Sequence, residues 1–161
     1  MQHMVSTMRP GTGRVGVVMP HGALFRGGKE AETRRWMIEQ NKLEALIGLP
    51  NNLFYSTTIP VALMIFRDAK LAGRQNKVLY IDARQRFKAG KNQNTLTRDD
   101  VDVISAAYHE GTDTTEKSGL LLRLVERAEI EGKDWDLNIG GCTSPIQKMQ
   151  DTRGLFRRSR Q

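Results

Sequence analysis

The stretch from residue 43 to residue 66 reads LEALIGLPNNLFYSTTIPVALMIF, which is two apolar runs joined by a more polar link. The runs, residues 43–49 and 59–66, have the length and nearly continuous apolar character of strands that are buried on both faces of a sheet. Residues 50–58 between them are too few to hold the crossover helix that parallel neighbours require. This stretch therefore predicts two strands that lie next to each other and antiparallel.

Two further apolar runs predict two more buried strands, residues 14–19 (RVGVVM) and 77–83 (KVLYIDA). Four segments are expected to be helical: residues 1–8, 29–41, 97–108 and 120–131. The third of these helices begins at Thr97, a preferred N-cap residue, and carries Asp99 and Asp100 in its first turn. Strands and helices combined in this order indicate the α/β fold class.

The composition of 161 residues, with 39% apolar and 27% charged, indicates one globular domain of ordinary size. No apolar run approaches the roughly 20 residues of a membrane helix, and no apolar signal core begins the chain, so we expect a cytoplasmic protein without a membrane partner. Cys142 is the only cysteine, which excludes an intrachain disulfide and a cysteine cluster for zinc. The three histidines lack metal-ligand spacing, so no metal site is expected.

The net charge of +7 permits contact with nucleic acid but does not demonstrate it. Residues 143–161 hold five basic side chains and one acidic side chain, which leaves a net charge of +3 for the rest of the chain. The body of the protein is therefore only weakly basic. A small basic DNA-binding protein is the least favoured of the functional hypotheses, because it rests on charge alone.

Residues 11–16 (GTGRVG) match the G-x-G-x-x-G pattern of dinucleotide-binding proteins. That motif follows a strand and opens a helix, so that a phosphate meets the helix N-terminus. Here an expected helix precedes the glycines and an expected strand follows them. We therefore interpret these residues as a turn that leads into a strand.

Two loops follow the carboxyl ends of expected strands, where open α/β sheets bind their ligands. In residues 20–28 (PHGALFRGG), Arg26 could bind a phosphate, or it could be an exposed side chain in a flexible connection. In residues 51–60 (NNLFYSTTIP), Phe54 or Tyr55 could stack on a base that has been flipped out of a duplex. The alternative is that Phe54 is a core residue that closes a hairpin. From spacing alone, the structural alternative is favoured for both loops.

A third loop, residues 88–94 (KAGKNQN), is polar and basic. Lys88 and Lys91 could follow the backbone of a nucleic acid. Such a stretch is more often a solvated loop without a ligand.

Five segments, taken in order, resemble the modification subunit of type I restriction-modification systems: residues 13–28, 43–60, 77–84 (KVLYIDAR), 90–94 (GKNQN) and 135–139 (WDLNI). The resemblance covers residues 1–140. It implies an α/β fold that is part of an S-adenosylmethionine-dependent, Rossmann-like methyltransferase sheet, with its antiparallel last strand, followed by C-terminal helices. The first three expected strands then correspond to the fifth, sixth and seventh strands of that sheet.

The resemblance also implies a division of the chain. Residues 1–83 are expected to be the C-terminal half of the methyltransferase domain, and residues 84–140 an extension with a loop and helices. Residues 141–161 do not resemble the family, and we expect an atypical basic tail that is disordered. A frameshifted or otherwise altered end is a hypothesis for this tail.

Members of the family transfer a methyl group from S-adenosylmethionine to N6 of adenine in DNA, together with a specificity subunit and a restriction subunit. Their donor-binding glycine motif and their Asn-Pro-Pro-aromatic motif would both lie before Met1, and the five prolines of this chain include no adjacent pair. No catalytic residue is therefore expected in the chain. Alone it should bind no S-adenosylmethionine and be inactive, and a separate N-terminal half is an expected partner.

The resemblance places the segment around Phe54 beside the flipped adenine. The base-binding candidates are Phe54, then Tyr55, and also Thr57, which could hydrogen-bond the base or fix the loop. Arg26, Lys88 and Lys91 are the candidates for contact with the DNA backbone. A non-catalytic module that binds methyltransferase or specificity subunits is the alternative function.

Overall fold

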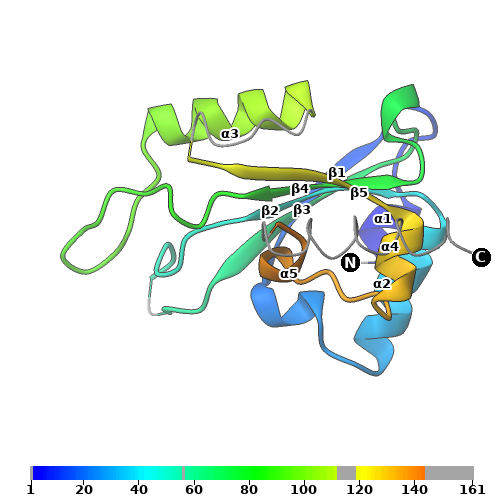
Figure 1. The fold of residues 1–161 in the computed structure, drawn as a ribbon, viewed down its shortest axis with the longest axis horizontal. Coiled ribbons are helices and arrows are strands. Elements are labelled where there is room, and N and C mark those ends of the chain that lie inside the picture. Colours follow the sequence, from blue (N-terminus) through cyan, green and yellow to red (C-terminus); the bar gives the residue numbers. More distant parts are fainter. Residues whose placement is uncertain (1, 56, 112–118, 144–161) are drawn as a thin grey trace, which may run out of the picture.

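A computed structural model describes residues 2–55, 57–111 and 119–143, which form a five-stranded mixed sheet with helices on both faces (Figure 1). The strand order is β1-β3-β2-β4-β5. The strands are β1 (Arg14–Pro20), β2 (Leu43–Gly48), β3 (Val61–Arg67), β4 (Lys77–Asp82) and β5 (Leu121–Glu126). β3 is antiparallel to both β1 and β2, which confirms the prediction from residues 43–66. β2 and β4 are parallel, and β5 is antiparallel to β4.

The helices divide between the two faces of the sheet, with α3 on one face and α1, α2, α4 and α5 on the other (Figure 1). Their bounds are α1 (Gln2–Ser6), α2 (Lys29–Glu39), α3 (Arg98–Glu110), α4 (Arg127–Gly132) and α5 (Ile139–Thr143), with short 3₁₀ helices η1 (His21–Leu24) and η2 (Ala72–Arg74). The predicted cap of α3 is confirmed. The Thr97 hydroxyl accepts from the Asp100 N–H at 3.2 Å, and the Asp100 carboxylate accepts from the Thr97 N–H at 2.9 Å.

The prediction of one helix over residues 120–131 was wrong. This segment begins with strand β5, and only from Arg127 onwards is it helical, as α4. The leucines and valine of β5 recur at spacings that suit a helix as well as a strand. Pairing with the free edge of β4 decides between them, because it gives the backbone of β5 a full register from Leu121 to Glu126 and buries Leu122 and Val125.

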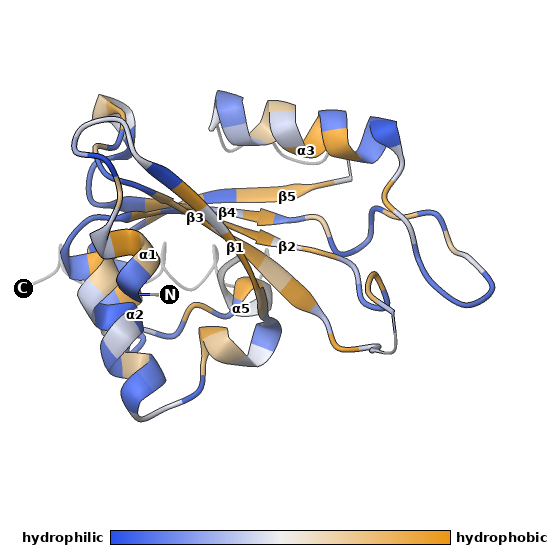
Figure 2. Cartoon of the chain, turned by 180° about the vertical axis from the view of Figure 1, so that it is seen from behind, coloured by the Kyte–Doolittle hydropathy of each residue, from blue (hydrophilic) through white to orange (hydrophobic). Residues whose placement is uncertain are grey.

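β1 was expected to be buried, and this too is corrected. Within the described residues β1 pairs with β3 alone, so it is an edge strand whose side chains alternate between half-buried and exposed. Val15, Val17 and Met19 pack against the core, whereas Val18 on the opposite face is 46% exposed. Figure 2 shows that the strands are apolar while α3 is amphipathic.

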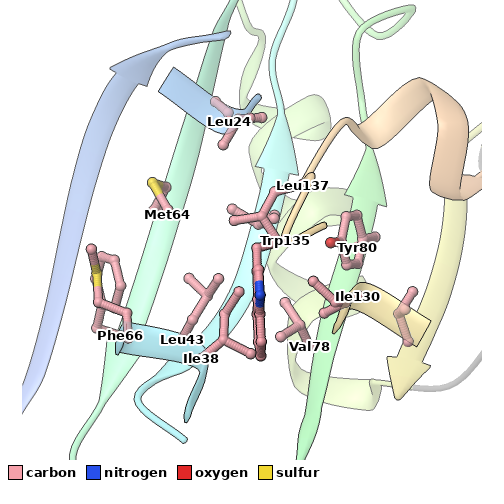
Figure 3. Close-up of a cluster of buried hydrophobic side chains, with 14 of the residues drawn as sticks. Leu24, Ile38, Leu43, Met64, Phe66, Val78, Tyr80, Ile130, Trp135 and Leu137 are labelled. Carbon is pink, nitrogen blue, oxygen red and sulfur yellow. The ribbon is translucent and has the colours of Figure 1, made fainter. Parts of the chain in front are cut away.

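The larger core lies between the sheet and the helices α1, α2 and α4, and Figure 3 shows part of it. Trp135 and Leu137 close this core, and they also hold the loop after β1. The Leu137 N–H donates to the Leu24 carbonyl at 3.0 Å. The buried Arg34 donates to the carbonyls of Ala23 at 3.0 Å and Trp135 at 3.3 Å. The 135–139 motif therefore fixes the position of the loop that contains Arg26.

No helix in the described residues is long and apolar enough to cross a membrane. Of the expected basic tail, the structure describes only residues 141–143, so the expected disorder concerns residues outside the described part. The division between residues 1–83 and 84–140 stays a prediction.

Candidate functional site

Three loops gather at one edge of the sheet. β1, β2 and β4 run in the same direction, since β3 is antiparallel to both β1 and β2, and β4 is parallel to β2. Their carboxyl ends therefore lie at the same edge, and residues 21–28, 49–60 and 83–97 follow them. The loops 49–60 and 83–97 project together from the end of the sheet (Figure 1). This is the edge at which open α/β sheets bind ligands.

Hydrogen bonds join the second loop to the third. The Asn94 backbone N–H donates to the Asn52 carbonyl at 2.8 Å, and the Asn94 side-chain amide donates to the Asn51 carbonyl at 3.0 Å. The Gln93 side chain donates to the Leu53 carbonyl. The motifs NNLF and GKNQN, about 40 residues apart in the sequence, thus form one unit.

The sequence supports this unit at two special backbone positions. Asn52 has a φ of 54°, in the left-handed region that asparagine tolerates better than most residues. A Cβ atom at Gly90 would collide with the Gln93 carbonyl oxygen, so the turn requires glycine there. Beyond this turn, Lys88 and Thr95 exchange backbone hydrogen bonds of 2.9 and 3.0 Å, which close a small hairpin.

The first loop is joined to the second through His21. Its backbone N–H donates to the Pro60 carbonyl at 2.9 Å, and its ring lies edge-on to Phe25, with the centroids 5.8 Å apart. Burial lowers the pKa of His21 below 6.5, and the Arg84 guanidinium lowers this pKa further, so the ring is neutral at pH 7. The three loops therefore form one connected surface.

The base-binding candidates lie at the tip of the second loop. The side chain of Phe54 is 45% exposed and that of Tyr55 is 89% exposed. The backbone of Phe54 pairs with Thr57, whose hydroxyl accepts from the Ile59 N–H at 3.2 Å. The alternative that Phe54 is a core residue does not fit its exposure, although its backbone does close a tight turn. Ser56 between them lies outside the described residues.

The three candidates for backbone contact, Arg26, Lys88 and Lys91, are all exposed. None of them has an ion pair with another residue in the part of the chain that the structure describes. Arg26 lies over Gly22, because a Cβ at Gly22 would be 3.0 Å from the Arg26 Nε. All three charges are thus available to an anion at this edge of the sheet.

The structure adds side chains that the sequence reasoning missed. A pocket of about 310 Å³ lies between the second and third loops, lined by Leu49, Asn51, Pro60, Arg84, Gln85 and Phe87. Arg84 is held by a bidentate pair with Asp82, with Nε–Oδ1 and Nη2–Oδ2 distances of 2.8 and 2.5 Å, and these hydrogen bonds raise the pKa of Arg84. The signal in the sequence was the charged pair Asp82 and Arg84 at the end of an apolar strand.

The glycines of residues 11–16 do not form a dinucleotide site, as expected from the sequence. Helix α1 precedes them and β1 follows, and the Gly11 N–H donates to the Asp68 carboxylate at 2.6 Å. Within residues 2–55, 57–111 and 119–143, no three His, Cys, Asp or Glu side chains gather as a metal site would require.

A family model described as N-6 DNA Methylase matches residues 1–151. The chain is 35% identical over 141 residues to the type I restriction enzyme MjaVII methylase subunit of Methanocaldococcus jannaschii, a match that covers 86% of this chain and 24% of that protein. It is 27% identical over 128 residues to the MpnII methylase subunit of Mycoplasma pneumoniae, covering 80% of this chain and 22% of that protein. The chain thus spans about a quarter of the length of these relatives.

Two solved structures of methyltransferase subunits are also similar to this chain. The type I restriction-modification methyltransferase subunit from Streptococcus thermophilus has a TM-score of 0.74 and 34% identity, and the match covers 82% of this chain and 27% of that one. The EcoKI M protein has a TM-score of 0.70 at 22% identity, covering 86% of this chain and 36% of that one, and supports the fold alone.

Proposed function

Because the chain belongs to the N-6 DNA methylase family, we propose that it supplies the loops that contact the flipped adenine and the DNA backbone in a type I restriction-modification adenine methyltransferase. The reaction is the transfer of a methyl group to N6 of an adenine in DNA. One observation carries the proposal. The exposed rings of Phe54 and Tyr55 stand on a loop that is hydrogen-bonded to the 88–95 hairpin, at the ligand-binding edge of the sheet.

The loop suits a base that has left the duplex. A planar ring at Phe54 offers stacking worth roughly 1–3 kcal/mol per base. The Thr57 hydroxyl oxygen accepts a hydrogen bond from Ile59, so its proton stays available to an acceptor on the base edge. Arg26, Lys88 and Lys91 would neutralise phosphates of the flanking DNA, and the affinity should then fall as salt rises.

The partners in this proposal are DNA, a specificity subunit, a restriction subunit and a polypeptide with the donor-binding and Asn-Pro-Pro-aromatic motifs. A structure of complex assembly in a type I restriction-modification system also matches this chain, with a TM-score of 0.62 at 22% identity. The interaction-module alternative would require assembly with these subunits without any effect on catalysis.

The family uses S-adenosylmethionine as its methyl donor, and the residues present do not fit this molecule. The first glycine-rich stretch is a turn held by Asp68, and the second leads into α2, whose first turn carries Glu30 and Glu32. No step of the reaction is therefore assigned to this chain alone.

Calorimetric titration of the purified chain with S-adenosylmethionine is expected to show no binding at micromolar concentrations. The same titration on an assembly with the missing motifs serves as the positive control. A micromolar dissociation constant for the isolated chain would contradict the assignment of the donor site to a separate segment.

Phe54→Ala tests the proposed function in an assembly reconstituted with the two missing motifs and a specificity subunit. Loss of 1–3 kcal/mol of stacking corresponds to a fall in kcat/KM of about 5- to 150-fold for adenine methylation. Binding to DNA with a mismatched target adenine should weaken in parallel, while the circular dichroism spectrum stays unchanged.

Two further variants separate stacking from loss of apolar surface. Phe54→Tyr keeps the ring and should retain most of the activity. Ile59→Ala removes an apolar side chain of the same loop, 56% exposed, and should have a small effect. Full activity of Phe54→Ala would show that the ring does not stack on the base, and an unfolded variant would restore the core interpretation.

A further inference from the structure

A second charged pocket lies at the other end of the strands, away from the three loops of the candidate site. It has a volume of about 230 Å³ and is lined by Arg14, Arg67, Leu71, Arg74, Tyr108 and His109. These residues come from the start of β1, the end of β3, the η2 segment and the last turn of α3. The seven residues of β3 separate this pocket from the candidate base site, a distance of roughly 20 Å at the rise of a β-strand.

A buried carboxylate beneath the pocket orders its cationic side chains. Glu44 is fully buried, and its Oε1 lies 3.4 Å from Arg67 Nη1 and 3.6 Å from Arg74 Nη1. The Tyr108 hydroxyl donates to Glu44 Oε2 at 2.6 Å. The Glu44 side chain lies on the α3 side of the sheet, at the position where the β2–β3 register shifts between Leu43 and Ala45.

The guanidinium group of Arg74 is already engaged in contacts within the protein. Its Nη2 donates to the carbonyls of Tyr108 and, at 3.3 Å, His109, and its guanidinium lies 5.2 Å from the centre of the Tyr108 ring. It thereby caps carbonyl groups at the end of α3 that would otherwise repel an anion. Arg74 is therefore a positioning residue, and Arg14 and Arg67 remain to face a ligand.

The pocket carries more positive charge than its carboxylate neutralises. Three guanidinium groups stand against Glu44 alone among the described acidic residues in contact with them. The Nε of Arg67 is buried and has no hydrogen-bond partner among the described residues. Arg14 is exposed and forms no ion pair within the same residues. Because the Nε of Arg67 is buried, Arg67 can meet a ligand in the pocket only through its terminal Nη groups.

We propose that this pocket binds a phosphate group through Arg14 and Arg67. Guanidinium forks match the geometry of phosphate oxygens and bind them with charge-assisted hydrogen bonds. The volume is below the range typical of larger ligands, so the site suits a single phosphate rather than a whole cofactor. The phosphate could be free or part of a DNA backbone. The inference stands independently of the proposed methylation.

The test is thermal denaturation of the full chain with inorganic phosphate added at constant ionic strength, with chloride as the reference. Phosphate is expected to raise Tm in a saturable way. Arg14→Gln should weaken its apparent Kd about tenfold or more, because charge-assisted hydrogen bonds are lost. Arg98→Gln makes the same change in net charge on the exposed Arg98 and should leave the phosphate Kd unchanged.

Arg67→Lys adds a second readout, since it keeps the charge opposite Glu44 but removes the fork, and should also weaken phosphate binding. A DNA duplex then distinguishes the two sources of the phosphate. If Arg14→Gln weakens DNA binding more than Arg98→Gln does, the ligand is a backbone phosphate. If only phosphate binding depends on Arg14, the ligand is free. Equal phosphate effects on wild type, Arg14→Gln and Arg98→Gln, or no effect at all, would overturn the proposal.

Discussion

Glu44→Ala is expected to destabilise the fold by about 3–5 kcal/mol, the usual cost of removing one partner from a buried ion pair. Glu44 is fully buried in β2, and the alanine variant would leave Arg67 and Arg74 without a counter-charge. The Tyr108 hydroxyl would lose its acceptor as well. The variant would still bury the two guanidinium groups and the hydroxyl group when it folds, but it would lose the interactions with Glu44 that offset the free-energy cost of this burial.

Urea denaturation at low protein concentration, followed by the combined fluorescence of Trp36 and the buried Trp135, measures the change in the free energy of unfolding. Glu44→Gln keeps an acceptor for Tyr108 but loses the charge, so its cost should be smaller than that of Glu44→Ala. Glu39→Ala is the matched control, because Glu39 forms an i,i+4 pair with the exposed Arg35 and should cost less than about 1 kcal/mol. Equal costs for Glu44→Ala and Glu39→Ala would show that the buried network does not stabilise the fold.

The predictions that succeeded rest on local rules with strong physical causes. A link of nine residues between two apolar runs left only an antiparallel pairing for β2 and β3. Thr97 and the aspartates after it marked the start of α3, because they satisfy the free N–H groups of a first turn. The resemblance then supplied the position of these strands in the methyltransferase sheet.

The features that were missed depend on contacts between distant segments. β5 is a strand because β4 offers it a partner, and the letters LLRLV do not encode that partner. The bonds between Asn52 and Asn94 likewise could not be derived from either loop alone. One signal was available for the buried network, since Glu44 is a charged residue inside an apolar run and requires partners if the strand is buried.

For the candidate site, the sequence pointed to the loop of residues 51–60 but could not decide the exposure of Phe54. Phe54 lies between Leu53, which is packed against a core cluster, and Tyr55, which is almost fully exposed. Whether Phe54 is packed like Leu53 or exposed like Tyr55 depends on the turn that it makes with Thr57. The pocket beside Arg84 was missed because its walls come from three separate segments.

The isolated chain is expected to self-associate at micromolar concentration, because β1 leaves one side of an apolar sheet open. Among the described residues β1 pairs only with β3, and Val18 is 46% exposed. An apolar groove of about 300 Å³ beside α3 extends this surface across β2 and β3. Unpaired strand edges with apolar side chains recruit further strands. Light scattering coupled to size-exclusion chromatography measures the resulting mass.

A polypeptide that carries the donor-binding and Asn-Pro-Pro-aromatic motifs should replace this self-association with a defined complex and raise Tm. Val18→Lys places a charge on the open edge and should reduce both self-association and formation of that complex. Trp36→Lys adds the same charge on α2, on the face of the sheet opposite the apolar groove, at 37% exposure, and should leave the edge-dependent pairing intact. A monodisperse monomer of the wild-type chain with a cooperative melt at high temperature would show that the β1 edge needs no partner strand, and that the sheet is stable as it stands.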